Sequence, residues 1–147
     1  MIKKEVLTLI ISEQEKLIKD IEKSVNRYRS ASDLDESDTL DPEDYSHQEE
    51  AKDMQLRLEQ RLIEEKFELE HLKKFKNKKI AVLDHGALVE TDEHYIYIGV
   101  SIAPFKFENK TIVCVSKNTP IVASLKNKSI GELVKIGENN FTIKSIS

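Results

Sequence analysis

The stretch "ASDLDESDTLDPEDYSHQEE", residues 31–50, holds nine Asp or Glu and no Lys or Arg. It separates two long stretches with helical periodicity, and its Pro42 cannot lie in the interior of a helix. The Asp, Ser and Thr residues around this proline favour turns and helix N-caps. We therefore expect the chain to reverse direction within residues 32–46. A solvated or disordered acidic segment is the alternative that composition alone leaves open.

Each flanking stretch carries one seam of positions spaced alternately by four and three residues, which is typical of paired helices. The first seam consists of Leu7, Ile11, Gln14, Ile18, Ile21, Val25 and Tyr28. The second consists of Ala51, Gln55, Leu58, Leu62, Glu65, Leu69 and Leu72. Two helices of similar length bury such seams most economically by folding back on each other. The sequence thus predicts an antiparallel coiled-coil hairpin over residues 1–75, with an acidic tip at residues 32–46.

The composition changes after Phe75, where a basic linker leads into short runs of β-forming residues separated by Gly and Asn. The runs cover residues 80–83, 87–89, 95–100, 111–115, 133–136 and 141–146. Thr119 and Pro120 are typical of an N-cap and first-turn proline, and predict a short helix through Leu125. The fold class expected is α+β, with residues 76–147 forming a small antiparallel β domain that contains one short helix.

The charge distribution is bipolar, although the net charge of the 147-residue chain is only −4. Nine of its 27 acidic residues lie within residues 31–50, so the remaining 18 are outnumbered by 23 basic residues. The single cysteine, Cys114, excludes an intrachain disulfide or a Cys-pair zinc site and favours a cytosolic setting. No signal-peptide apolar region and no run of membrane-spanning length is present. We expect a soluble, cytoplasmic protein.

The segment "VSKNTPIVASLKNKSIGELVKI", residues 115–136, is similar to a C-terminal pattern of the Gre transcript-cleavage factors. That pattern comprises a Ser-Pro-Ile-like turn, an Ala-x-Leu helix, a Lys-x-x-Gly-Asp-like turn and a strand. A helical hairpin with an acidic tip followed by a small β domain also resembles this family, which binds bacterial RNA polymerase. The resemblance implies an FKBP-like β domain that docks on the polymerase through Thr119, Pro120 and Ile121.

At the tip, "DLDE" resembles the D-L-x-E stretch whose two acids are functional in the family. The resemblance implies that Asp33 and Glu36 act there, and Asp38 with Asp41 form a reserve pair of the same spacing. The tip would enter the polymerase secondary channel and complete the shell of a loosely held Mg²⁺, promoting cleavage of backtracked RNA. The protein would then be an accessory factor and not an enzyme. It would share Mg²⁺ with RNA polymerase and hold no cofactor or stable metal of its own. It would be monomeric when free, would reach RNA or DNA only through the polymerase, and would bind no membrane.

Other candidate residues favour structural roles. His47 near the tip is a candidate metal ligand, but an exposed turn histidine is usually polar surface. His71, His85 and His94 show no HxxH or HExxH spacing, so a zinc enzyme is not expected. The alternation of Tyr95 and Tyr97 predicts a strand with both aromatic side chains on one face. The basic residues 73–79 are expected to be a solvated linker.

Two rival functions remain open from the sequence. One is a Gre-like modulator or inhibitor that binds RNA polymerase without promoting cleavage, which the long and strongly acidic tip favours. The other is an unrelated coiled-coil adaptor whose acidic loop binds a basic partner, which the C-terminal pattern disfavours.

Overall fold

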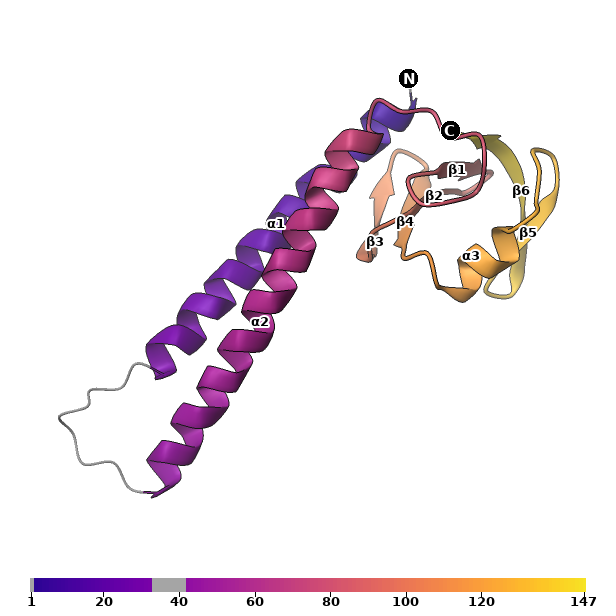
Figure 1. Ribbon diagram of the computed structural model, residues 1–147. Helices are drawn as coiled ribbons and strands as arrows, with labels where there is room; N and C mark the ends of the chain where they lie inside the picture. Colours follow the sequence, from indigo (N-terminus) through magenta and orange to yellow (C-terminus); the bar gives the residue numbers. More distant parts are fainter. Residues whose placement is uncertain (1, 33–41) are drawn as a thin grey trace. The chain divides into compact units, whose positions relative to one another are not determined.

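The computed structural model describes residues 2–32 and 42–147. Two long helices, α1 (Ile2–Ser32) and α2 (Pro42–Phe75), precede a mixed sheet and one short helix (Figure 1). The later elements are β1 (Leu88–Thr91), β2 (His94–Ile98), β3 (Ile102–Phe107), β4 (Lys110–Val115), α3 (Pro120–Leu125), β5 (Leu133–Ile136) and β6 (Asn139–Ile146). The α+β class is confirmed. Among the described residues, no helix combines the length and apolar content needed to cross a bilayer.

The chain forms two compact units, one of residues 1–13 with 68–147 and the other of residues 14–67. The long helices contribute to both, because the first turns of α1 and the last turns of α2 belong to the same unit as the sheet. The predicted domain boundary after residue 75 stays a prediction based on composition.

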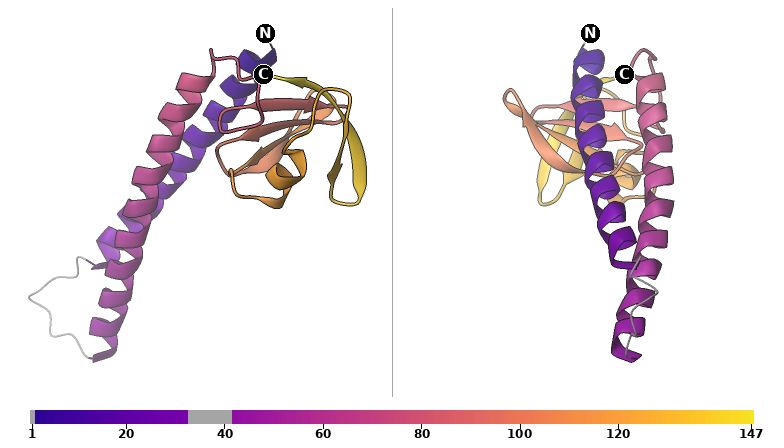
Figure 2. Two further views of the ribbon diagram at one scale, coloured as in Figure 1. Left: turned by 45° about the vertical axis from the view of Figure 1, so that its right-hand side comes forward. Right: turned by 90° about the vertical axis from the view of Figure 1, so that its left-hand side faces the viewer.

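Within residues 14–67, α1 and α2 lie side by side and run antiparallel (Figures 1 and 2). Three side-chain hydrogen bonds between the helices join increasing residue numbers on α1 to decreasing residue numbers on α2. The pairs are Gln14 with Glu65, Arg29 with Glu59, and Ser32 with Gln55. On α1 the seam residues Ile18, Ile21 and Val25 are buried. Regular coiled-coil packing along this seam stays a prediction.

The six strands form one sheet in the order β3-β4-β2-β1-β6-β5. The expectation of a purely antiparallel domain is wrong, because β2 and β4 pair in parallel, with Ile96 opposite Val113. Strand β3 lies at the edge of the sheet and pairs antiparallel with β4. Strand β4 therefore lies between β3 and β2, where it runs parallel to β2. The β5–β6 hairpin is confirmed, whereas an FKBP-like assignment stays a prediction.

Two details of the predicted strands differ from the structure. Residues 80–83 form no strand; Ile80 and Leu83 instead pack their side chains against a core cluster. Conversely, β3 was not predicted. It contains Pro104, which a strand tolerates at a sheet edge, and its pairing with β4 is irregular between Ile102 and Phe105.

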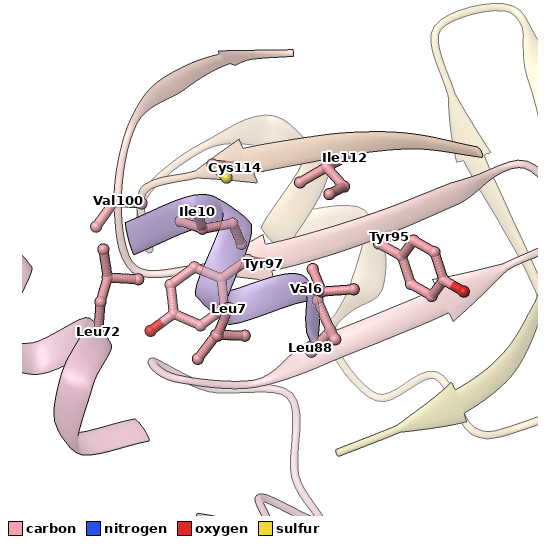
Figure 3. Packing of buried hydrophobic residues seen from close by; sticks show 10 residues of the cluster. All are labelled: Val6, Leu7, Ile10, Leu72, Leu88, Tyr95, Tyr97, Val100, Ile112 and Cys114. Carbon is pink, nitrogen blue, oxygen red and sulfur yellow. The ribbon is translucent and has the colours of Figure 1, made fainter. Parts of the chain in front are cut away.

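The sheet of the first unit is covered on both faces. Tyr95 and Tyr97 pack in a cluster with Val6, Leu7 and other buried residues of the helix ends (Figure 3). This arrangement confirms that the two tyrosines share a face. The alternate residues of β2, Ile96 and Ile98, lie in a second cluster that also contains Val122 and Leu125 of α3. Strand β2 is therefore buried on both sides.

Candidate functional site

Hydrogen bonds join the C-terminal end of α1 to the side of α2, at positions several residues after the start of α2. At the end of α1, Ser32 Oγ lies 2.9 Å from the carbonyl oxygen of Arg29 and 3.1 Å from Oε1 of Gln55 on α2. The side-chain amide of Gln48 donates to the carbonyl oxygen of Ser32 at 2.7 Å. The last carbonyl groups of a helix have no partner within the helix. Gln48 therefore satisfies one of these groups and ties α1 to α2.

An ion pair extends this network. Arg29 Nη2 lies 3.0 Å from Glu59 Oε1, which also accepts a hydrogen bond from Gln55 Nε2 at 3.1 Å. These donors, Gln55 first and then Arg29, lower the pKa of Glu59. We call Arg29, Ser32, Gln48, Gln55 and Glu59 the helix-end clamp. It joins the C-terminal end of α1 to residues 48–59 of α2.

The predicted catalytic residues Asp33 and Glu36, and the reserve pair Asp38 and Asp41, lie outside the described residues. On the α2 side, the helix begins at Pro42 and carries Glu43 and Asp44 in its first turn. Proline is favoured in the first turn because no backbone donor is needed there. Acidic side chains interact favourably with the helix N-terminus. This acidic first turn begins immediately after the predicted ligands.

A shallow groove lies beside the helix-end clamp and is lined by Ser32, Tyr45, Gln48, Glu49 and Lys52. Tyr45 is half exposed, and His47 is exposed in the same part of α2. His47 does not belong to the group of possible metal ligands formed by Glu68, His71 and His85.

The predicted polymerase-contact residues lie at the start of α3. Thr119 occupies the N-cap position and Pro120 the first turn, which confirms the predicted helix start. The Thr119 hydroxyl makes no side-chain cap; it donates to the carbonyl oxygen of Ser116 at 3.0 Å. Pro120 is exposed, whereas Ile121 is half-buried and packs against the second core cluster. The predicted contact residues are thus only partly exposed.

A basic groove next to α3 was not foreseen from the sequence. It is lined by Ala81, Val82, Leu83, Asp84, Lys117, Lys126, Asn127, Lys128 and Ile146. Its three lysines come from the two ends of α3, and Asp84 pairs with Lys117 at 3.4 Å. Val82 is 71% exposed at its edge. The groove combines residues 81–84, 117–128 and 146, which only the fold brings together.

The histidines are also arranged in a way that sequence spacing did not reveal. Ligand atoms of Glu68, His71 and His85 all lie within 4.8 Å of one another. By contrast, His94 packs edge-to-face on Phe141, and burial lowers its pKa. Cys114 is buried and burial raises its pKa to about 12, which suits a structural thiol.

No family model and no curated protein matches this chain. The functional assignment therefore depends on the residues and contacts themselves.

Proposed function

We propose that this protein is a Gre-like accessory factor of RNA polymerase that promotes cleavage of backtracked RNA. In this proposal Asp33 and Glu36 supply carboxylates to a weakly held Mg²⁺ of the polymerase. The β-rich unit docks on the enzyme through the surface at the start of α3.

The observation that carries the proposal is the helix-end clamp. A segment that only repels other proteins or stays solvated does not require the preceding helix end to be joined to α2. Here Ser32 is joined to Gln48 and Gln55, and Arg29 is joined to Glu59. Such contacts support delivery of the acidic segment as one positioned element. Positioning lowers the entropic cost of placing ligands at a reacting centre.

The chemistry of carboxylates supports the same proposal. Mg²⁺ prefers oxygen ligands and commonly takes one or two protein carboxylates while it keeps several waters. Two carboxylates from an accessory protein can complete the shell of such an ion and orient a water for attack on a phosphodiester. The acidic charge also favours entry into a basic channel, through an attraction that salt weakens.

The test uses purified bacterial RNA polymerase stalled in a backtracked complex with labelled RNA. Adding the protein with Mg²⁺ is expected to shorten the RNA from its 3′ end, and the Asp33→Asn, Glu36→Gln protein should bind without doing so. Binding without any cleavage by the unmodified protein would favour the modulator or inhibitor reading. Absence of binding would contradict the proposed action on RNA polymerase and favour a coiled-coil adaptor.

The modulator remains the second candidate because acidic residues continue into the start of α2. Glu43, Asp44, Glu49 and Glu50 all follow Pro42. Many carboxylates favour binding in a basic channel, whereas a Mg²⁺ ion takes only one or two of them as ligands. A modulator is expected to compete with nucleotide entry into the polymerase. A multiple-round transcription assay measures this competition.

A further inference from the structure

Glu68, His71 and His85 meet although they come from two separate parts of the chain. Glu68 and His71 are three residues apart on α2, so their side chains project from the same helix face. His85 lies in the connection between α2 and β1. All three belong to the unit that contains the sheet.

The backbone around His85 is fixed by several hydrogen bonds. Asp84 Oδ1 accepts from the backbone N–H of His85 at 2.8 Å, and the N–H of Gly86 donates to the carbonyl oxygen of Ile98 at 2.7 Å. The first of these bonds, followed by the nearby Lys117, lowers the pKa of Asp84. This loop is therefore attached to strand β2 and presents His85 from a defined position.

Two glycines allow close packing here, Gly86 against the Phe75 ring and Gly99 against the His85 ring. Gly86 has a φ of +91°, and a Cβ there would collide with the ring of Phe75. A Cβ on Gly99 would lie 3.2 Å from Cε1 of His85. The His85 ring meets both His71 and Phe75 edge-to-face, with centroids 5.5 Å apart in each pair. The imidazole is thus held against α2 by packing.

One carboxylate oxygen of Glu68 is buried without a partner in the described part of the chain, although the side chain as a whole is 34% exposed. Its Oε2 is buried and has no hydrogen-bond partner among the described residues. Nδ1 of His71 is 4.0 Å away, which is too long for a hydrogen bond. A buried carboxylate oxygen without a donor is costly. A cation shared with the two imidazoles would satisfy it.

We propose that Glu68, His71 and His85 bind a divalent transition-metal ion of the Zn²⁺ class. Two imidazoles and one carboxylate are a ligand set that Zn²⁺ accepts, whereas Mg²⁺ and Ca²⁺ prefer oxygen ligands only. Ligand atoms on a tetrahedral zinc are roughly 3.4 Å apart for bonds of about 2.1 Å. Separations within 4.8 Å therefore need only small side-chain rotations to close.

The ion would have a fourth position for water, because three protein ligands leave a tetrahedral shell open. His71 is 46% exposed, so solvent has access to the site. Burial, with Glu68 among the lesser causes, raises the pKa of the neighbouring Tyr97. Binding would link α2 to the loop before β1. This function is independent of the proposed action on RNA polymerase.

The experiment is titration of tag-free, EDTA-treated protein with Zn²⁺ in a calorimeter, with Co²⁺ absorption in the visible range as a second readout. We expect one ion per chain and no displacement by millimolar Mg²⁺. Glu68→Gln and His71→Ala should each weaken binding about tenfold or more, because loss of even an outer-shell partner typically costs 10- to 100-fold. His47→Ala, which removes an exposed histidine elsewhere on α2, is the matched control and should bind as the unmodified protein does.

Thermal unfolding provides a check on folding. At the same concentration, Zn²⁺ should raise the Tm of the unmodified protein and of His47→Ala by more than that of Glu68→Gln. His85→Ala alone is less informative, because His85 also packs on Phe75 and its loss would affect folding as well. His71→Ala changes an exposed side chain and Glu68→Gln keeps the shape of the side chain, so both avoid this difficulty. Equal affinity in the unmodified, Glu68→Gln and His71→Ala proteins would overturn the proposal, as would displacement by Mg²⁺ or loss of binding in His47→Ala.

Discussion

The side-chain amide of Gln14 on α1 donates a 2.6 Å hydrogen bond to Oε2 of Glu65 on α2, within the seam between the two helices. The same amide lies 3.0 Å from the carbonyl oxygen of Glu65. Gln14 is completely buried. A polar pair in an apolar seam disfavours other registers, because a shifted helix would leave both groups without partners.

We expect Gln14→Leu to lower the free energy of unfolding by about 1 to 3 kcal/mol, since the carboxylate of Glu65 loses its donor. Adding Glu65→Leu should recover most of that loss, because an apolar pair leaves no unsatisfied group. Urea unfolding followed by circular dichroism at 222 nm measures both effects. A double variant as unstable as the sum of its single changes would show that Gln14 and Glu65 are not coupled.

The apolar seam gives a second prediction. Ile18 is 7% exposed, and Ile18→Ala should cost about 2 to 5 kcal/mol of stability. Leu62 is only half-buried, so Leu62→Ala should cost less. Leu56 is 52% exposed and serves as the matched control, with an expected change of about 0.5 kcal/mol or less. A larger loss at Leu62 than at Ile18 would contradict the burial described for α1 and α2.

Lys3 gives a prediction about pH. It is almost completely buried, its Nζ donates to the carbonyl oxygen of Lys78 at 2.7 Å, and burial lowers its pKa to about 8. Between this value and the usual 10.5 the unfolded chain binds more protons, so stability should rise with pH. From pH 8 to 9.5 the contribution of Lys3 to this rise should be about 1 to 2 kcal/mol.

Lys3→Met should abolish that rise, whatever its effect on stability at pH 7. The effect of Lys3 is the difference between the slopes of the two proteins, because the raised pKa values of Cys114 and Tyr97 act in the opposite direction above their ordinary values of 9.0 and 10.0 in both proteins. Urea unfolding at several pH values gives the slopes. Parallel slopes for Lys3→Met and the unmodified protein would mean that Lys3 is not the titrating group.

The proposed metal-ligand role of the acidic segment predicts that position matters more than charge. Asp33→Asn with Glu36→Gln should reduce stimulated RNA cleavage by at least about tenfold while polymerase binding persists. Asp38→Asn with Asp41→Asn removes the same charge and is the matched control. Cleavage is measured at two salt concentrations, since a purely electrostatic guide would be weakened by salt. Equal small losses from both pairs would contradict the ligand role.

For polymerase docking, the half-buried Ile121 is a poor position to test, because Ile121→Asp would also disturb the core. The exposed Ala123, one turn after Pro120, is better. Ala123→Asp should weaken polymerase binding about tenfold, which corresponds to about 1.4 kcal/mol. Ser101→Asp adds the same charge at an exposed position between β2 and β3. Unchanged binding by a folded Ala123→Asp protein would exclude this surface.

The sequence by itself determined the elements that local chemistry specifies. The alternating four-and-three spacing predicted two long helices, and Pro42 predicted the break that the start of α2 confirms. Thr119 and Pro120 predicted the start of α3, and the alternation of Tyr95 and Tyr97 predicted their common face. These signals are local, because helix and strand periods place side chains on faces without reference to the rest of the chain. The roles of Asp33 and Glu36 stay predictions.

Only the tertiary structure decided what those faces contact. Leu7 and Leu72 fit the helix seam by spacing, yet they pack in the core cluster beside the sheet, since the seam pattern does not distinguish a helix partner from a strand partner. The parallel pairing of β2 with β4 and the edge position of β3 likewise depend on contacts between distant residues. His71 and His85 became neighbours of Glu68 for the same reason. Hydrophobic burial is non-directional, so local periodicity selects a buried face, while the packing of the whole unit selects its partner.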